Sequence, residues 1–145
     1  MTPTAGPWFG APAPGEELPP QEFVLTAEDL RRYADASGDH NPIHLDDRVA
    51  REFGLKDGII AHGMLVMGRL AAYVAAAAGA EVPASLAVRF RSPVRPGVAM
   101  VITGRVVSVE GAQVVVEAAA APRAGGAPAV TATWVGQWRM AAAAT

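Results

Sequence analysis

An acidic side chain and an imidazole lie five positions apart in the polar stretch Tyr33–Ala50: Asp39 and His44. Gly38, just before them, tolerates backbone angles that other residues avoid. Pro42, between them, fixes its own φ and keeps the preceding residue out of the helical region. The two side chains are therefore not neighbours on one helical face, but a bent, stiffened segment can fold them towards one point. A carboxylate and an imidazole that converge on one water form the outline of a general acid/base site.

A second candidate group lies where an apolar helix is expected to begin. The stretch Ile59–Ala80 contains a single charged residue, Arg69, and predicts a helix buried on nearly all sides. If the helix begins near Gly63, the N–H group there is unpaired and carries the positive end of the helix dipole. Such a group can bind an oxyanion or a polarised carbonyl. The alternative is that Gly63 eases packing against a sheet. His62, beside it, is interpreted as structural and is left outside the catalytic set.

A metal site is the weakest of the candidate chemistries. His40 and His44 lie four residues apart, which is the spacing of two ligands on one helical face. Pro42 lies between them and argues against a helix there. The chain has no cysteine to add a ligand. The sequence therefore predicts no metal and no other cofactor.

Length and composition restrict the classes of protein to which the chain can belong. A chain of 145 residues matches one ordinary domain with a sizeable core. A net charge of -2 and a pI near 5.9 give no electrostatic footprint for nucleic acid. The absence of cysteine fits a reducing compartment, and no secretory signal is visible, so we expect a cytoplasmic protein. Ile59–Ala80 is long enough to span a membrane, but Arg69 and His62 would be costly in lipid, so a buried helix is favoured and no membrane partner is expected.

The remaining elements follow from hydrophobic periodicity and turn signals. Residues 1–20 form a Pro- and Gly-rich arm, residues 21–140 the folded domain, and residues 141–145 a disordered tail. A helix starts after the N-cap Thr26, with Asp29 in capping-box position, and ends at Ser37-Gly38. A second short helix is expected over Asp46–Phe53. The expected strands are Glu22–Leu25, Leu86–Phe90, Met100–Val109, Gln113–Ala120 and Val130–Met140. This order predicts an α+β domain with an antiparallel sheet on a long helix.

Three blocks of this sequence together resemble a known family. The first is an aromatic residue followed by Ser-Gly-Asp-x-Asn-Pro-Ile-His and, after five residues, a small residue. The second is Ile60–Met64 and the third is Val88–Gly97, and the likeness extends from Glu17 to Trp138. In this order they resemble the MaoC-like, (R)-specific enoyl-CoA hydratase family. The residues on the first block are Tyr33, Ser37, Gly38, Asp39, Asn41, Pro42, Ile43, His44 and Ala50.

The resemblance implies a hot-dog fold and a hydratase/dehydratase that interconverts trans-2-enoyl and (R)-3-hydroxyacyl thioesters of CoA or an acyl carrier protein. It implies catalysis by Asp39 and His44 and binding of the thioester oxygen at Gly63. Loop support is expected from Ser37, Gly38, Asn41 and Pro42. A single hot-dog sheet has an open edge, so we expect a homodimer, with a heterodimer of two different hot-dog chains as the alternative.

Several alternatives stay open at this stage. A hot-dog thioesterase would commonly carry a carboxylate on the central helix, and this chain has no Asp or Glu between Asp57 and Glu81. A binding or partner subunit of a mixed dimer often loses the acid/base pair, which this chain keeps. Three arginines could meet phosphates of CoA or an acidic carrier, or could line a solvated strand face: Arg89, Arg91 and Arg95. The acyl chain length, the carrier, the direction of the reaction and the pathway are not determined.

Overall fold

The computed structural model describes residues 12–79 and 83–138, which form four helical elements and a five-stranded sheet. The sheet is antiparallel throughout, in the strand order β1-β3-β4-β5-β2. The helical elements are α1 (Ala27–Ser37), the short 3₁₀ helix η1 (Pro42–His44), α2 (Asp47–Glu52) and α3 (Gly63–Ala78). The strands are β1 (Glu17–Phe23), β2 (Ser85–Phe90), β3 (Met100–Glu110), β4 (Gln113–Pro122) and β5 (Val130–Gln137).

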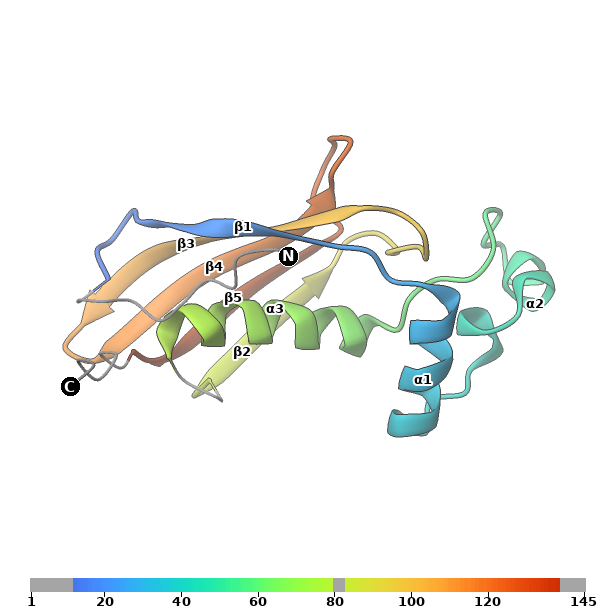
Figure 1. Cartoon of the computed structure of the whole chain (residues 1–145), viewed down its shortest axis with the longest axis horizontal. Helices are drawn as coiled ribbons and strands as arrows, with labels where there is room; N and C mark the ends of the chain where they lie inside the picture. The colour runs from blue at the N-terminus through green and yellow to red at the C-terminus, as the bar shows by residue number, and fades with distance from the viewer. Residues whose placement is uncertain (1–11, 80–82, 139–145) are drawn as a thin grey trace, which may run out of the picture.

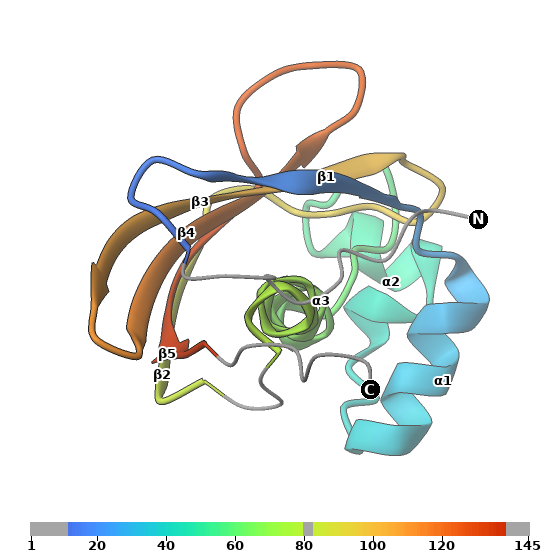
Figure 2. The ribbon, with the colours of Figure 1, turned by 60° about the vertical axis from the view of Figure 1, so that its left-hand side comes forward.

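Helix α3 packs against one face of the sheet, and the sheet curves around it (Figures 1 and 2). Alternate residues of the strands face α3 and are buried, as a period of two requires. Trp134 and Leu70 are fully buried between the two layers. This arrangement is the hot-dog fold, and the α+β class expected from the sequence is confirmed. Helices α1 and α2 lie together beyond the N-terminal end of α3, where the connecting segments converge (Figure 1).

The start of α3 is set by hydrogen bonds that hold the preceding residues in an extended form. The N–H of Ile59 donates to Asp47 Oδ1 at 2.9 Å, and the N–H of Ala61 donates to the Val94 carbonyl at 2.7 Å. These bonds tie the segment to α2 and to the loop after β2, the N-cap His62 is itself non-helical at φ −58° and ψ 128°, and the helix begins at Gly63, four residues after the start of the apolar run. Within the two described stretches, the structure holds no helix with the length and apolarity needed to cross a membrane.

Strand β1 begins at Glu17, five residues before the expected strand at Glu22. Pro19 and Pro20 lie inside it, which is possible because β1 is an edge strand and pairs only with β3. The pairing register shifts between Leu18 and Gln21, around these prolines. The strand therefore extends into the segment expected to be an arm. Residues 1–11 of that arm and the expected tail, residues 141–145, lie outside the described residues.

Tyr73 ties the central helix to this edge of the sheet. Its hydroxyl donates to the Pro19 carbonyl at 2.9 Å. A Cβ added to Gly104 would stand only 2.9 Å from the Tyr73 ring. Burial raises the pKa of Tyr73 to about 12, so the hydroxyl stays protonated and remains a donor at neutral pH. Gly104 is therefore needed on β3 for α3 to approach the sheet closely.

Candidate active site

The turn that carries Asp39 is built by local backbone preferences. Helix α1 ends with Gly38 in the left-handed conformation, at φ 80°, and the Gly38 N–H donates to the Ala34 carbonyl at 2.8 Å. The Asp39 N–H then donates to Ser37 Oγ at 3.2 Å. The Asn41 N–H donates to Asp39 Oδ1 at 3.2 Å. One carboxylate oxygen of Asp39 thus closes its own turn, and the other is left for chemistry.

The return from this turn places His44. Asn41 is the N-cap of η1, and its Oδ1 accepts from the Ile43 N–H at 3.2 Å. Pro42 occupies the first turn of η1, where its missing N–H costs no hydrogen bond. Ala50, the small residue of the motif, is fully buried on α2. The residues expected to support the loop therefore all lie in or beside the two turns that join Asp39 to His44.

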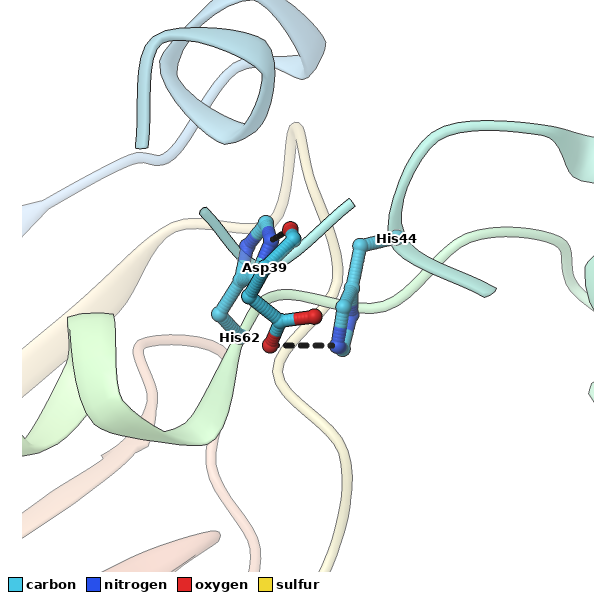
Figure 3. A group of neighbouring side chains, drawn as sticks. All are labelled: Asp39, His44 and His62. Carbon is cyan, nitrogen blue, oxygen red and sulfur yellow. Dashed lines mark hydrogen bonds and ion pairs between the residues drawn. The ribbon is translucent and has the colours of Figure 1, made fainter. Parts of the chain in front are cut away.

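Asp39 and His44 approach each other, as Figure 3 shows, with 3.9 Å between Asp39 Oδ2 and His44 Nε2. The His44 side chain is only 10% exposed, whereas that of Asp39 is 51% exposed. His44 Nδ1 lies 2.8 Å from the Ile60 carbonyl oxygen. A carbonyl can only accept, so in neutral His44 the proton sits on Nδ1, and Nε2 presents a lone pair to the carboxylate.

Two hydrogen-bond acceptors that face each other at this separation can both accept from one water molecule. A water has two O–H donors and can stand about 2.8 Å from both acceptors, off the line that joins them. With both its hydrogens directed at Asp39 and His44, the water directs an oxygen lone pair away from them. The arrangement can therefore orient and deprotonate a nucleophilic water.

His62 is buried and contacts both members of the Asp39–His44 pair. It is 1% exposed, and its ring stacks on that of His44 with 4.0 Å between centroids and 30° between planes. Its Nε2–H donates to the Asp39 backbone carbonyl at 3.0 Å, and the Tyr33 ring lies 4.8 Å away, centroid to centroid. Burial lowers the pKa of His62, although the hydrogen bond to Asp39 opposes the shift. His62 is thus neutral at pH 7.

A cavity of about 320 Å³ lies next to the pair, between α3 and the end of β2. His44 and Gly63 both line it, together with apolar side chains such as Val66 and Phe90. Gly63 is the first residue of α3, so its N–H has no partner within the helix. A Cβ at Gly63 would stand 3.1 Å from the Phe90 ring. The cavity therefore has a basic end at His44 and a donor at Gly63, and a mostly apolar wall suited to an acyl chain.

A second, larger hollow contains none of these groups. It measures about 800 Å³ and lies on the sheet face opposite α3, over residues such as Thr103, Glu117 and Thr131. It is a broad depression on a solvated strand face, so size alone does not indicate the site. Arg91 lines both hollows, Arg89 lines only the larger one, and Arg95 pairs with Asp57 at 3.5 Å.

Asp39, His44 and His62 are also close enough together to be tested as a metal site, with one ligand atom of each within 4.8 Å of the others. An imidazole binds a metal through a lone pair in the plane of its ring. The rings of His44 and His62 are stacked rather than edge to edge, with 4.0 Å between centroids, so their in-plane lone pairs lie in two separate planes and do not converge on one ion. One nitrogen of each ring already donates to a carbonyl. The donor set fits acid/base chemistry and does not fit a metal.

A family model confirms the resemblance suggested by the motif. The model for the MaoC like domain matches residues 10–122. The chain belongs to the MaoC-like domain family. The matched range includes all three motif blocks, and with them the Asp39–His44 pair and Gly63.

Two curated relatives each match about half of the chain. The mitochondrial 3-hydroxyacyl-[acyl-carrier-protein] dehydratase of Arabidopsis thaliana is 38% identical over 74 residues, which are 51% of this chain and 44% of the relative. The 3-hydroxyacyl-thioester dehydratase X of Mycobacterium tuberculosis (strain ATCC 25618 / H37Rv) is 44% identical over 82 residues, 54% of this chain and 28% of the relative. The chain thus spans less than half the length of both.

Solved structures match over most of the chain. A MaoC-like dehydratase superposes with a TM-score of 0.83 at 31% identity, over 94% of this chain and 43% of its own. The R-hydratase PhaJ1 from Pseudomonas aeruginosa superposes with a TM-score of 0.74 at 25% identity, over 85% of this chain and 79% of its own. The second match shows that one hot-dog unit accounts for most of an R-hydratase chain.

Sequence reasoning placed His62 outside the catalytic set, and its surroundings are the main addition that the structure makes to the site. The available signal was its position directly before the helix start at Gly63. A side chain there lies at the positive, N-terminal end of the helix dipole rather than on a helix face. Burial and stacking on His44 could not be deduced from that position, because Tyr33 and His44 come from other turns of the chain.

Proposed function

We propose that this protein is a hydratase/dehydratase that interconverts trans-2-enoyl and (R)-3-hydroxyacyl thioesters. The observation that carries the proposal is the pair of facing acceptors, Asp39 and His44, beside a cavity that Gly63 also lines. The curated relatives, both named as dehydratases of 3-hydroxyacyl thioesters, support the same reaction class. The PhaJ1 match supports the (R) configuration of the hydroxyacyl product.

In the direction of hydration, the thioester carbonyl accepts a hydrogen bond from the Gly63 N–H. This bond draws electrons from the conjugated double bond and makes C3 electrophilic. Water held by Asp39 and His44 attacks C3 and loses a proton to this pair. Negative charge collects on the thioester oxygen until C2 takes up a proton. The pair thus acts first as base and then as acid, and the reverse sequence gives dehydration.

The direct test is turnover by the purified chain. We expect loss of the enoyl absorbance with trans-2-enoyl-CoAs of graded length, then with enoyl groups on an acyl carrier protein, and formation of the (R) product by chiral analysis. Asp39→Asn serves as the control for contaminating activity. A pure, folded chain that leaves every enoyl thioester unchanged contradicts the proposal. Release of free thiol instead would indicate a thioesterase, against which the absence of any carboxylate on α3 argues.

We propose further that the protein works as a homodimer joined at the β2 edge. Among the described strands, β1 and β2 are the two edges of the sheet, and only β1 carries prolines that block pairing. Near β2, the side chain of Phe90 is 50% exposed and that of Met64 on α3 is 60% exposed. Pairing of two β2 strands about a two-fold axis would cover both and set the two α3 helices side by side.

Sedimentation at working concentration and on dilution tests this assembly. We expect a dimer whose dissociation removes activity together with stability, because the partner closes the cavity. A stable, active monomer would refute the arrangement. Activity that appears only after mixing with a second hot-dog chain would favour the heterodimer instead.

A further inference from the structure

One short segment of the chain contacts every group that the proposed reaction uses. The Ile60 carbonyl accepts from His44 Nδ1 at 2.8 Å, the His62 ring donates to the Asp39 carbonyl at 3.0 Å, and Gly63 offers its N–H at the helix start. The segment is itself held on both sides. The Ile60 N–H donates to the Ile43 carbonyl at 3.2 Å, and the Ala61 N–H donates to the Val94 carbonyl at 2.7 Å.

We propose that His62 is a positioning residue that holds the Asp39 turn in place against the His44 ring, so that both side chains act on one water. This inference rests on the proposed hydratase function and deepens it. His62 does not reach the reacting atoms in this role. It acts through Asp39, by the N–H that it donates, and through His44, by the ring on which His44 stacks.

The Asp39 turn needs such a support because its other bonds are local. The bonds to Ser37 Oγ and from the Asn41 N–H join residues two positions apart, so they move with the turn. The bond from His62 crosses 23 positions of sequence and joins the turn to the start of α3. Without it, the half-exposed Asp39 would share no described hydrogen bond with the segment that fixes His44 and Gly63. The 3.9 Å separation of Asp39 and His44 would then depend on local turn geometry alone.

The chemistry of the His62 ring argues against packing as its only role. Its Nδ1 atom is buried and has no hydrogen-bond partner among the described residues. A phenyl ring would fill the same space between Tyr33 and His44 without leaving a polar atom unpaired. An imidazole in this place is therefore explained by the one bond that a phenyl ring cannot make, the bond from Nε2 to Asp39. Burial lowers the pKa of His62, which keeps the ring neutral beside His44.

Two substitutions separate the donor from the ring. His62→Phe keeps a flat ring between Tyr33 and His44 and removes the N–H. His62→Gln removes the ring and keeps an N–H donor at the reach of Nε2. We expect His62→Phe to lower kcat by about 10–100-fold with KM within about threefold, because a displaced base loses rate rather than substrate affinity. We expect His62→Gln to recover most of that loss. Thermal midpoints identify a temperature at which both variants are folded.

A His62→Phe variant that keeps kcat within about twofold of the unmodified protein overturns the proposal, and so does a His62→Gln variant that loses as much as His62→Phe. The proposal also has a test without substrate. The chain has three histidines, so ¹⁵N labelling of histidine gives a spectrum simple enough to assign. We expect a neutral His62 with its proton on Nε2, and a His44 whose Nδ1 carries a proton that is hydrogen-bonded to the Ile60 carbonyl.

A charged His62 at neutral pH, or one with its proton on Nδ1, overturns the positioning role whatever the enzyme does. The spectrum also separates the two proposals. If the unmodified chain turns over no enoyl thioester, the hydratase function fails, and the histidine spectrum still decides whether His62 holds the Asp39 turn.

Discussion

Two aspartate–histidine pairs with the same five-residue spacing overlap in this chain, Asp35–His40 and Asp39–His44. In the first, the side chains are 81% and 56% exposed, and His40 Nε2 lies 3.1 Å from Asp35 Oδ1. In the second, the nearest atoms are 3.9 Å apart, and His44 is almost buried. Of these four residues only His44 lines the cavity, so the pair with the shorter contact contributes nothing to its wall.

The two pairs differ in whether the contact between acid and imidazole leaves hydrogen-bond acceptors free for a water. In the exposed pair, the imidazole donates directly to the carboxylate, and this hydrogen bond raises the pKa of His40. The two groups are each other's hydrogen-bond partners, so the facing atoms are not free to orient a water. In the other pair, the Ile60 carbonyl accepts a hydrogen bond from His44 Nδ1–H, so in the neutral imidazole both facing atoms are acceptors. A backbone group distant in the sequence therefore sets the tautomer of His44.

The largest expected effect comes from Asp39→Asn, with Asp35→Asn as its matched control. The amide keeps an oxygen that can accept from the Asn41 N–H, so the turn is retained while the base is lost. We expect turnover to fall by about 10²–10⁴-fold in Asp39→Asn and to stay within about twofold in Asp35→Asn. Steady-state rates on an enoyl-CoA measure both. Equal losses in the two variants would mean that the pairs do not differ in the way described.

His44→Ala is expected to lose about as much as Asp39→Asn. The double variant should lose little more than either single variant, because residues that act on one water act as a unit. Independent losses that multiply would show that Asp39 and His44 do not share a water. His40→Ala is the control in the other pair, and its turnover should match that of the unmodified protein.

Gly63→Pro tests the Gly63 N–H, a hydrogen-bond donor that has no counterpart beside the exposed Asp35–His40 pair. Proline suits the first position of a helix, and His62 before it has φ −58° and ψ 128°, which a following proline accepts. Gly63→Ala is the matched control, since it also meets the Phe90 ring but keeps the N–H. We expect turnover of Gly63→Pro to lie about 10²–10³-fold below that of Gly63→Ala, at similar thermal midpoints. A folded Gly63→Pro variant as active as Gly63→Ala would remove this N–H from the reaction.

A smaller effect is expected on stability against pH. The pKa of His62 is lowered in the folded protein by burial, so below its ordinary value of 6.5 the unfolded chain binds the extra proton and the folded chain resists it. Stability is therefore lost as pH falls below about 6.5. His62→Gln removes this contribution. Between pH 7.5 and about 5.5, we expect the thermal midpoint of the unmodified protein to fall further than that of His62→Gln, by on the order of a few °C. Parallel midpoints in the two proteins would contradict the burial of a neutral His62.

The smallest effect concerns the exposed pair itself. The pKa of His40 is raised, first of all by its hydrogen bond to Asp35. Asp35→Asn should lower the pKa of His40 towards its ordinary value without changing turnover. NMR titration of the His40 ring measures the shift. If activity followed the titration of His40, the two pairs would be coupled, and the comparison would need revision.

Local structure was predictable wherever one or two residues decide it. Thr26 and Asp29 form both bonds of the expected capping box, at 3.1 Å and 2.8 Å. The strands expected over Met100–Val109 and Gln113–Ala120 form the antiparallel pair β3 and β4, joined by a tight turn after Glu110. The start of β1 was not predictable in the same way, because its edge position lets Pro19 and Pro20 enter a strand. The apolar run begins at Ile59, but the helix starts at Gly63, the position considered for its N–H group, after a segment that long-range bonds from Ile59 and Ala61 tie to other parts of the chain.

The sequence alone was enough to propose which residues are catalytic and how the chain bends between them. The bend depends on φ, ψ and hydrogen bonds to near neighbours at Gly38, Asn41 and Pro42. The local sequence is enough to determine these preferences. Only the tertiary structure decided which nitrogen of His44 faces Asp39, because the deciding carbonyl belongs to Ile60, 16 residues away. It also decided that His62 is buried against both groups. Such contacts depend on how separate segments pack around α3, and no local preference of the chain encodes that packing.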